Sequence, residues 1–198
     1  HDVALVSPDT HDDESKSQAT LVMFDDTTQG DRTGTIENTP ASGDDPSMTL
    51  VSGFGMGNGL GDLVFGHDTP DDSSDDFAYS RGITFNTIEV AELLLGTGND
   101  TVTIKSTDAD TVTVVHGGAG SDHIMVEASS GPLVIYGDTS ADGSRYTSTP
   151  QNPTGTAYQW QDVFDYDDVI DASASSGFVV AYGGIGNDII RGGSAGDF

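Results

Sequence analysis

A short phrase of glycine, asparagine or serine, and aspartate recurs along the second half of the chain, and it constrains the fold more than any other feature. The phrase reads GTGND at 96–100, GGAGSD at 117–122, YDD at 166–168 and GIGND at 184–188. Two short runs rich in β-branched residues, such as TVTI and then TVTVV, separate successive aspartates. Two strands and two turns in about twenty residues are typical of a parallel β-solenoid.

Alternation of side chains within these runs predicts which residues fill the interior. In TVTI, for example, the two aliphatic residues share one face of the strand and the two threonines share the other. One repeat cannot bury that face alone, so we expect neighbouring repeats to stack. The residues expected to face inward are Val102, Ile104, Val112, Val114, Ile124, Val126, Leu133 and Ile135.

The charge of the chain points to cations as partners. It carries 33 acidic residues against six Lys and Arg, for a formal charge of −27. Such a balance argues against binding to nucleic acid or to an anionic membrane surface. Most of the acidic residues are aspartates beside Gly, Ser or Thr, and short carboxylates in tight turns suit calcium. Carboxylates stacked one strand spacing apart would repel one another unless cations lay between them.

Features that the sequence lacks argue against disulfide-stabilised proteins, thiolate metal sites and membrane-inserted proteins. It has no cysteine, hence no disulfide and no thiolate metal site. No apolar stretch is long enough to span a bilayer, so we expect no membrane insertion. The sequence begins without methionine and stops within a repeat, from which we expect a piece of a longer protein.

The last repeats resemble a known family. GGIGNDIIR at 183–191 matches every fixed position of the nonapeptide G-G-x-G-x-D-x-U-x, and GGSAGDF at 192–198 departs from it at Ala195. In these repeats the chain resembles the RTX, or haemolysin-type, calcium-binding repeat proteins of bacteria. The resemblance covers 90–137 and 165–198. It implies a parallel β-roll folded around several calcium ions and export from the cell by type I secretion.

The resemblance also implies which residues bind calcium. In the family, the sixth-position aspartate and the carbonyls of turn glycines hold the ions along one edge. The residues implied are Asp100 with Gly96 and Gly98, Asp122 with Gly118 and Gly120, Asp188 with Gly184, Gly186 and Asn187, and also Asp168 and Asp197. The turn before Asp168 lacks glycines, and the repeat that Asp197 should face is missing. The alternative, that degenerate turns hold their shape without metal, stays open here.

The expected fold class is therefore all-β: a parallel β-roll or β-solenoid with calcium-binding turns, preceded by an irregular β-rich N-terminal region. We expect three segments: an acidic tail or linker at 1–19, an irregular β-rich N-terminal region at 20–82 with an acidic loop at 67–76, and the RTX-like β-solenoid at 83–198 with an insertion at 144–162.

Three less regular stretches call for separate predictions. GITFNTIEVAELLL at 82–95 contains helix formers, but its β-forming start and its direct run into a turn favour a strand. The pattern of residues 19–39 predicts two strands joined by an Asp-rich turn. The pattern of 48–66 predicts a strand at each end, with a glycine-rich run between them.

The insertion 144–162 gathers aromatic side chains beside polar residues. Its aromatic residues are Tyr146, Tyr158 and Trp160. Such side chains could stack on sugar rings, or they could pin a long loop to the solenoid. Carbohydrate is therefore an alternative partner.

Catalysis finds no support in the sequence, so we do not expect an enzyme. None of the five histidines forms H-E-x-x-H. GGSAG at 192–196 fits G-x-S-x-G around Ser194, but a nucleophile elbow needs a strand before it and a helix after it.

We therefore expect a calcium-binding structural module of an extracellular or cell-surface bacterial protein, such as an adhesin or a filament subunit, which folds when calcium binds. Neighbouring copies or other surface proteins are possible partners. One alternative is the repeat domain of a secreted RTX hydrolase or toxin whose catalytic part lies outside this chain. The other is a carbohydrate-binding surface module.

Overall fold

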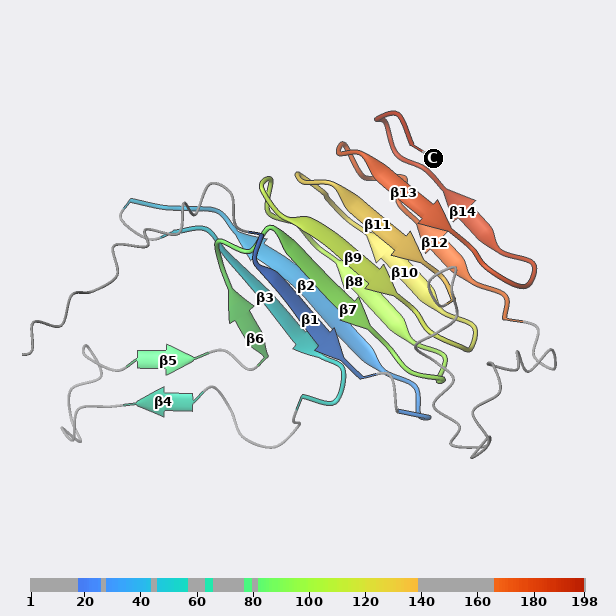
Figure 1. Ribbon diagram of the computed structural model, residues 1–198, viewed down its shortest axis with the longest axis horizontal. Coiled ribbons are helices and arrows are strands. Elements are labelled where there is room, and N and C mark those ends of the chain that lie inside the picture. Colours follow the sequence, from blue (N-terminus) through green and yellow to red (C-terminus); the bar gives the residue numbers. More distant parts are fainter. Residues whose placement is uncertain are drawn as a thin grey trace, which may run out of the picture.

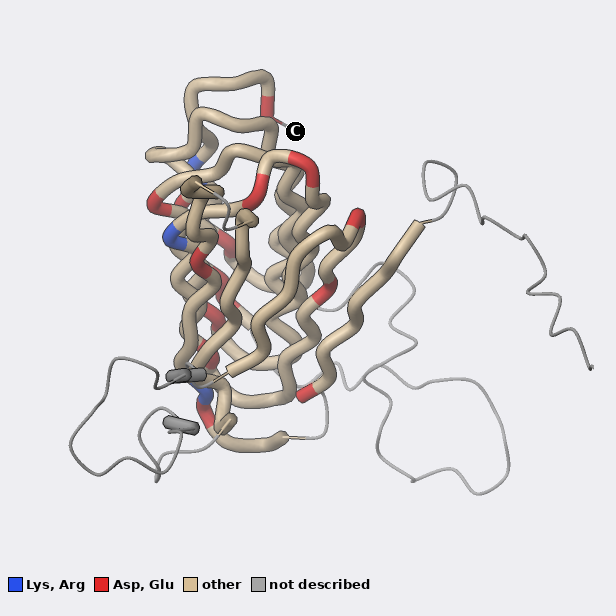
Figure 2. Tube along the Cα trace, turned by 90° about the vertical axis from the view of Figure 1, so that its left-hand side faces the viewer, with Lys and Arg blue, Asp and Glu red and all other residues tan. Residues whose placement is uncertain are grey.

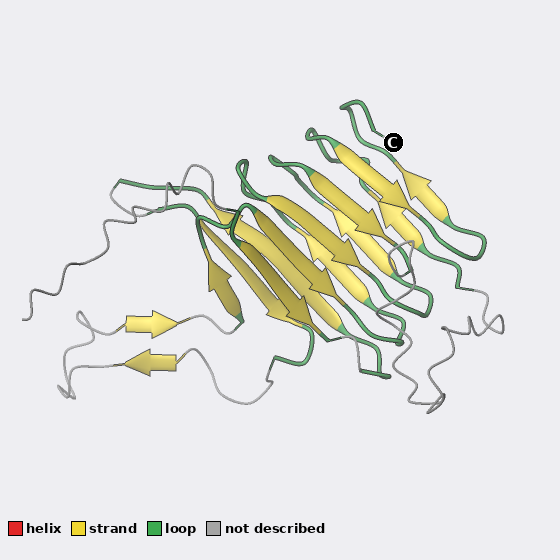
Figure 3. Ribbon diagram, in the orientation of Figure 1, coloured by secondary structure: helices red, strands yellow, loops and turns green. Residues whose placement is uncertain are grey.

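The structure is a computed structural model, and it describes residues 18–25, 28–43, 46–56, 63–65, 77–79, 82–138 and 166–197. Every regular element in these ranges is a β-strand (Figure 3), and none of the described segments is a helix able to cross a membrane. The strands are β1 (Thr20–Phe24), β2 (Thr33–Thr39), β3 (Met48–Gly53), β4 (Leu63–Phe65), β5 (Phe77–Tyr79), β6 (Ile83–Phe85), β7 (Val90–Leu94), β8 (Thr101–Ile104), β9 (Val112–His116), β10 (His123–Val126), β11 (Leu133–Tyr136), β12 (Val169–Asp171), β13 (Val179–Tyr182) and β14 (Ile189–Arg191).

Two sheets pack face to face (Figure 1). The five-stranded sheet has the order β1-β7-β9-β11-β13, and all of its pairs are parallel. The seven-stranded sheet has the order β14-β12-β10-β8-β2-β3-β6. From β7 to β14 the chain passes alternately between the two sheets, so each turn between them lies beside the corresponding turn of the neighbouring strands.

The expected fold class, a parallel β-roll or β-solenoid preceded by an irregular N-terminal region, is wrong. The seven-stranded sheet is mixed, because β3 is antiparallel to both β2 and β6, and β4 and β5 form a separate antiparallel pair. The N-terminal strands also do not precede the sheets: β1 pairs with β7, and β2 pairs with β8. The twenty-residue period could not predict this arrangement, since the segments that form β2, β3 and β6 do not carry it.

The interior between the sheets confirms most of the expected inward positions. Val102, Ile104, Ile124, Val126, Leu133 and Ile135 are all buried in one core cluster. The prediction for Val112 and Val114 is wrong, because Thr113 and Val115 face the core instead. The run TVTVV carries valine on both faces, so its alternation is ambiguous. Pairing decides the face, since Thr113 lies opposite Leu133 and Val115 opposite Ile135.

The strand preference for 82–95 is confirmed, although two strands occupy the segment, β6 and β7. The two strands expected in 19–39 are β1 and β2, and strands also lie at both ends of 48–66. Predictions for the acidic loop 67–76, for the insertion 144–162 and for most of the tail 1–19 fall outside the described residues. The proposed segment boundaries remain predictions.

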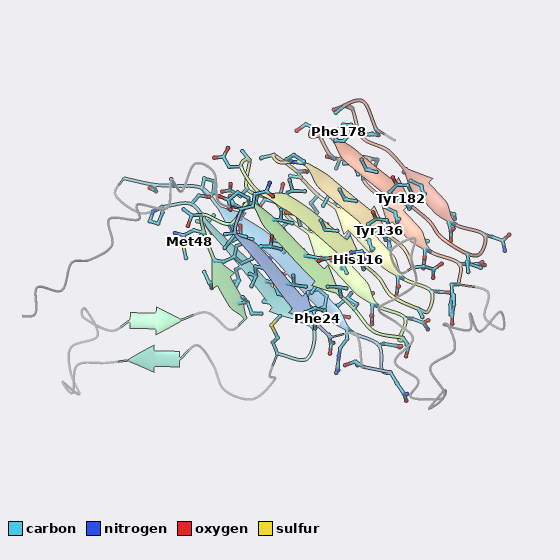
Figure 4. All side chains as sticks on the ribbon, in the orientation of Figure 1. Phe24, Met48, His116, Tyr136, Phe178 and Tyr182 are labelled. Atoms are coloured by element: carbon cyan, nitrogen blue, oxygen red, sulfur yellow. The ribbon has the colours of Figure 1, made fainter. Side chains whose placement is uncertain are left out.

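A row of aromatic rings follows the outer face of the five-stranded sheet (Figure 4). His116 stacks on Tyr136 with ring centroids 4.7 Å apart, and Tyr136 stacks on Tyr182 at 5.0 Å. The Nε2 atom of His116 lies 3.0 Å from a carboxylate oxygen of Glu92. Parallel pairing in register brings these rings together, so His116 has a packing role that its place beside a turn did not indicate.

Candidate metal centre

The turns that lead from the five-stranded to the seven-stranded sheet stack along one side of the molecule. They are 95–100, 117–122, the pair of segments 137–138 and 166–168, and 183–188. We call this side the aspartate edge. Figure 2 shows acidic residues recurring from turn to turn. The parallel pairing of the flanking strands sets this stacking, and it brings residues far apart in sequence into one column.

A ladder of hydrogen bonds joins the aspartates of this edge. The backbone N–H of Arg32 donates to Oδ1 of Asp100 at 2.6 Å, and that of Asp100 donates to Oδ1 of Asp122 at 2.7 Å. The N–H of Asp122 donates to Oδ1 of Asp168 at 2.7 Å, and that of Asp168 to Oδ1 of Asp188 at 3.0 Å. Each carboxylate therefore fixes the backbone of the preceding turn. The structure thus brings together four of the predicted calcium-binding aspartates.

A second ladder runs in the opposite sense through the preceding residue of each turn. The backbone N–H of Ser121 donates to Oδ1 of Asn99, and the N–H of Asp167 donates to Oγ of Ser121. Asn187, a predicted calcium ligand, donates its backbone N–H to Oδ1 of Asp167 at 2.8 Å and its side-chain amide to the same oxygen at 3.2 Å. In this structure Asn187 ties two turns together.

The second carboxylate oxygen of three ladder aspartates has no hydrogen-bond partner. Oδ2 of Asp100, Asp122 and Asp168 is buried and unpaired, and the three residues are only 1–2% exposed. Burial, and to a smaller extent the charge of neighbouring carboxylates, raises the pKa of Asp100 to about 6, of Asp122 to about 8 and of Asp168 to about 7. A bound proton or a bound cation would therefore stabilise these buried oxygens.

Two of the unpaired oxygens lie in a cradle left by a glycine. A β-carbon on Gly117 would lie within 3.0 Å of both Oδ2 of Asp122 and the carbonyl oxygen of Gly137. A β-carbon on Gly137 would likewise meet Oδ2 of Asp168 and the carbonyl oxygen of Gly183. In each cradle a carboxylate oxygen faces a carbonyl oxygen. Calcium takes both kinds of oxygen as ligands.

Two glycines that lie against the carboxylate of their own turn were missing from the predicted site. Gly117 and Gly183 are the leading glycines of their repeats, which is the signal that could have identified them. The ligands implied by the family begin one residue later. A glycine at this leading position lies against the carboxylate of its own turn. Only the geometry of the turn reveals this contact.

The predicted glycines shape the turns in two ways. Gly118, Gly120, Gly184 and Gly186 adopt positive φ between 113° and 126°. Gly96 and Gly98 are needed instead for close approach, because a β-carbon there would meet backbone oxygens of residues 28 and 30. The Gly96 carbonyl accepts the backbone N–H of Ala119 at 2.8 Å, so that oxygen already has one partner.

Asp197 lies apart from the other predicted ligands. Its Oδ2 accepts the backbone N–H of Gly193 at 2.5 Å, and Gly193 packs against the carbonyl of Ser175, which lies in a turn on the opposite edge. Hydroxyl groups form several of the hydrogen bonds in the turns of that edge. Thr107 and Ser129 join their hydroxyls at 3.2 Å, and Ser175 donates to the carbonyl of Gly177.

No basic side chain described in the structure neutralises the ladder. Arg32 pairs with Asp25 at 3.0 Å, Lys105 pairs with Glu37, and Arg191 pairs with Asp171. Nor do three or more His, Cys, Asp or Glu side chains of the described segments form a group that could hold a metal ion. A cation at this edge would therefore need backbone carbonyls or water in addition to carboxylates.

Comparison with known proteins gives no independent assignment. No family model, curated protein or solved structure matches the chain. The likeness to RTX repeats therefore rests on the repeated sequence motifs alone.

Proposed function

We propose that this chain is a calcium-binding structural module of an extracellular bacterial surface protein, and that calcium bound along the aspartate edge stabilises its fold. The observation that carries the proposal is the column formed by Asp100, Asp122 and Asp168. Each presents a buried oxygen without a partner, and in two cases that oxygen faces a glycine carbonyl. The proposal assigns no catalytic role to the described residues.

The energetics of burial support a cation at this edge. A buried charge left without its partner destabilises a fold by about 3–5 kcal/mol. Three ionised carboxylates in one column would therefore rival the whole stability of a typical domain, about 5–15 kcal/mol. Protonation or a bound cation removes this penalty. Near neutral pH, protonation of Asp100, whose pKa is about 6, is incomplete, so a cation is the more effective neutraliser.

The donor set favours calcium over other divalent ions. Carboxylates and carbonyls line the cradles, and no histidine or cysteine ligand accompanies them among the described residues. Oxygen ligands suit calcium and magnesium, whereas zinc favours nitrogen and sulfur. Calcium also accepts six to eight ligands in flexible geometry, which suits turns that supply carbonyls and leave room for water.

An extracellular setting follows from the same chemistry. Extracellular calcium modules bind with dissociation constants of about 10⁻⁴–10⁻³ M. The RTX resemblance and the absence of cysteine agree with a secreted bacterial protein stabilised by calcium rather than by disulfides. A surface adhesin or a filament subunit is the kind of parent protein that such a module would serve.

Circular dichroism during calcium titration tests the proposal. The chain, freed of divalent ions with EGTA, should gain β signal and thermal stability as calcium rises to about 10 mM, and EGTA should reverse both. Magnesium at the same concentration serves as the control and should have a much smaller effect. Equal spectra and equal melting temperatures with and without calcium would refute the proposal.

A further inference from the structure

Asp138 stands where neighbouring turns have glycine. Gly118 packs against the backbone of Gly96 in the preceding turn, and Asp138 takes the corresponding place one turn further along. Its backbone N–H donates to the carbonyl of Gly183 at 3.2 Å, and its carboxylate lies over Gly184. The chain therefore substitutes a charged side chain at a position that the repeat motif reserves for glycine.

The side chain of Asp138 is buried between two turns. Asp138 is 5% exposed, and its Oδ2 accepts the backbone N–H of Ile185 at 2.6 Å. Its Oδ1 is buried and has no hydrogen-bond partner, as is true of Oδ2 of Asp168. Two unpartnered carboxylate oxygens thus belong to residues at the start and the end of the same turn.

This part of the edge concentrates negative charge. Asp188 places its carboxylate between the same two turns, with Oδ1 on the backbone N–H of Asp168 and Oδ2 against Gly183. Burial first, and then the charge of Asp188, raise the pKa of Asp138, and the charge of Asp138 in turn raises the pKa of Asp168. The described Lys and Arg side chains all form their ion pairs elsewhere.

We propose that Asp138 is a further ligand of a divalent cation of the calcium type bound by Asp168 and the carbonyl of Gly183. The inference rests on the proposed function for the identity of the ion. Its side-chain ligands lie on either side of segment 139–165, since Asp138 directly precedes that segment and Asp168 follows it by three residues. A cation here would fasten the two ends of that segment to each other and to the turn 183–188.

The donor atoms explain why such a site takes calcium. Both side-chain ligands are carboxylates, and a carbonyl oxygen lies beside one of them, within 3.0 Å of the position that a β-carbon on Gly137 would take. Two carboxylates and a carbonyl leave further coordination positions for water. Calcium tolerates such a mixed and incomplete protein shell.

Counting bound ions in single-charge variants tests the site. Native mass spectrometry of the full chain, titrated with calcium alone, should show one ion fewer in Asp138→Asn than in the wild type. The asparagine oxygen can still accept the hydrogen bond from Ile185, so the fold has no evident reason to fail. Asp167→Asn is the matched control, because it removes one charge from an exposed side chain of the same turn and should leave the count unchanged.

Asp138→Gly provides a second variant, since it restores the residue found in this place in neighbouring turns, and it too should lose one ion. An unchanged count and affinity in both Asp138 variants would overturn the inference while leaving the proposed function intact. A wild-type chain that binds no calcium would overturn the proposed function itself, and this inference with it.

Discussion

Replacing Asp122 by asparagine should stabilise the chain without calcium and should reduce the stabilisation that calcium gives. The substituted side chain keeps an oxygen for the backbone N–H of Asp100. Its amide group takes the place of Oδ2, the atom that faces the carbonyl of Gly137 and has no partner. The variant thus removes a buried charge and supplies a donor where two acceptors meet.

The magnitude without calcium follows from the pKa. Burial raises the pKa of Asp122 from 3.8 to about 8, and each pKa unit corresponds to about 1.4 kcal/mol. At pH 8.5, where the wild-type carboxylate is largely ionised, the variant should therefore be more stable by about 3–5 kcal/mol. Below about pH 4 the carboxyl is protonated in both the folded and the unfolded state, and the two proteins should have similar stability.

Calcium should narrow the difference between the two proteins. A ligand present at one hundred times its dissociation constant adds about 2.7 kcal/mol to stability. The variant loses a charged ligand and should gain less from calcium than the wild type does. Urea unfolding at pH 8.5, in EGTA and in calcium, measures both differences. The reasoning is refuted if Asp122→Asn is less stable than the wild type in EGTA, or if calcium stabilises both proteins equally.

Three further predictions test the same structure. Without divalent ions, stability should fall as pH rises from about 4 to about 8, because the raised pKa values of Asp100 and Asp168 give the folded state more bound protons than the unfolded state. Equal urea midpoints at pH 5 and pH 8 would contradict this prediction. Gly118→Ala should lower stability by about 1–3 kcal/mol, because φ is +113° and the new methyl group would meet the Gly96 carbonyl, whereas Gly30→Ala, in open space, should change it little. Val115→Ala should lower stability by about 2 kcal/mol in calcium and Val114→Ala by less than half of that, and equal losses would contradict the assigned face of β9.

The sequence was most informative where it repeats. The spacing of Asp100, Asp122 and Asp188, with strands between them, predicted one edge lined with carboxylates, and the structure stacks these residues in one ladder. Parallel strands in register translate a sequence period directly into a spatial column, and this is why the prediction succeeded.

The sequence was least informative where the chain pairs outside that period. The antiparallel partners of β3 depend on long-range register that no local pattern records. The inward face of β9 was ambiguous because valine occurs on both faces, and only its pairing with β11 resolves it.

Asp138 was missed for a related reason. Its turn is interrupted in sequence by 139–165, so its alignment with Gly118 and Gly184 is visible only once the strands are paired. The cradle formed by Gly117 and Gly137 likewise depends on which atoms of adjacent turns meet.

Anomalous diffraction from crystals grown with calcium tests the central claim most directly. Data collected at a long X-ray wavelength should place peaks along the aspartate edge, at about 2.3–2.6 Å from Oδ2 of Asp122 and of Asp168. Well-ordered turns 117–122 and 183–188 without any anomalous peak between them, in crystals soaked at millimolar calcium, would contradict the account.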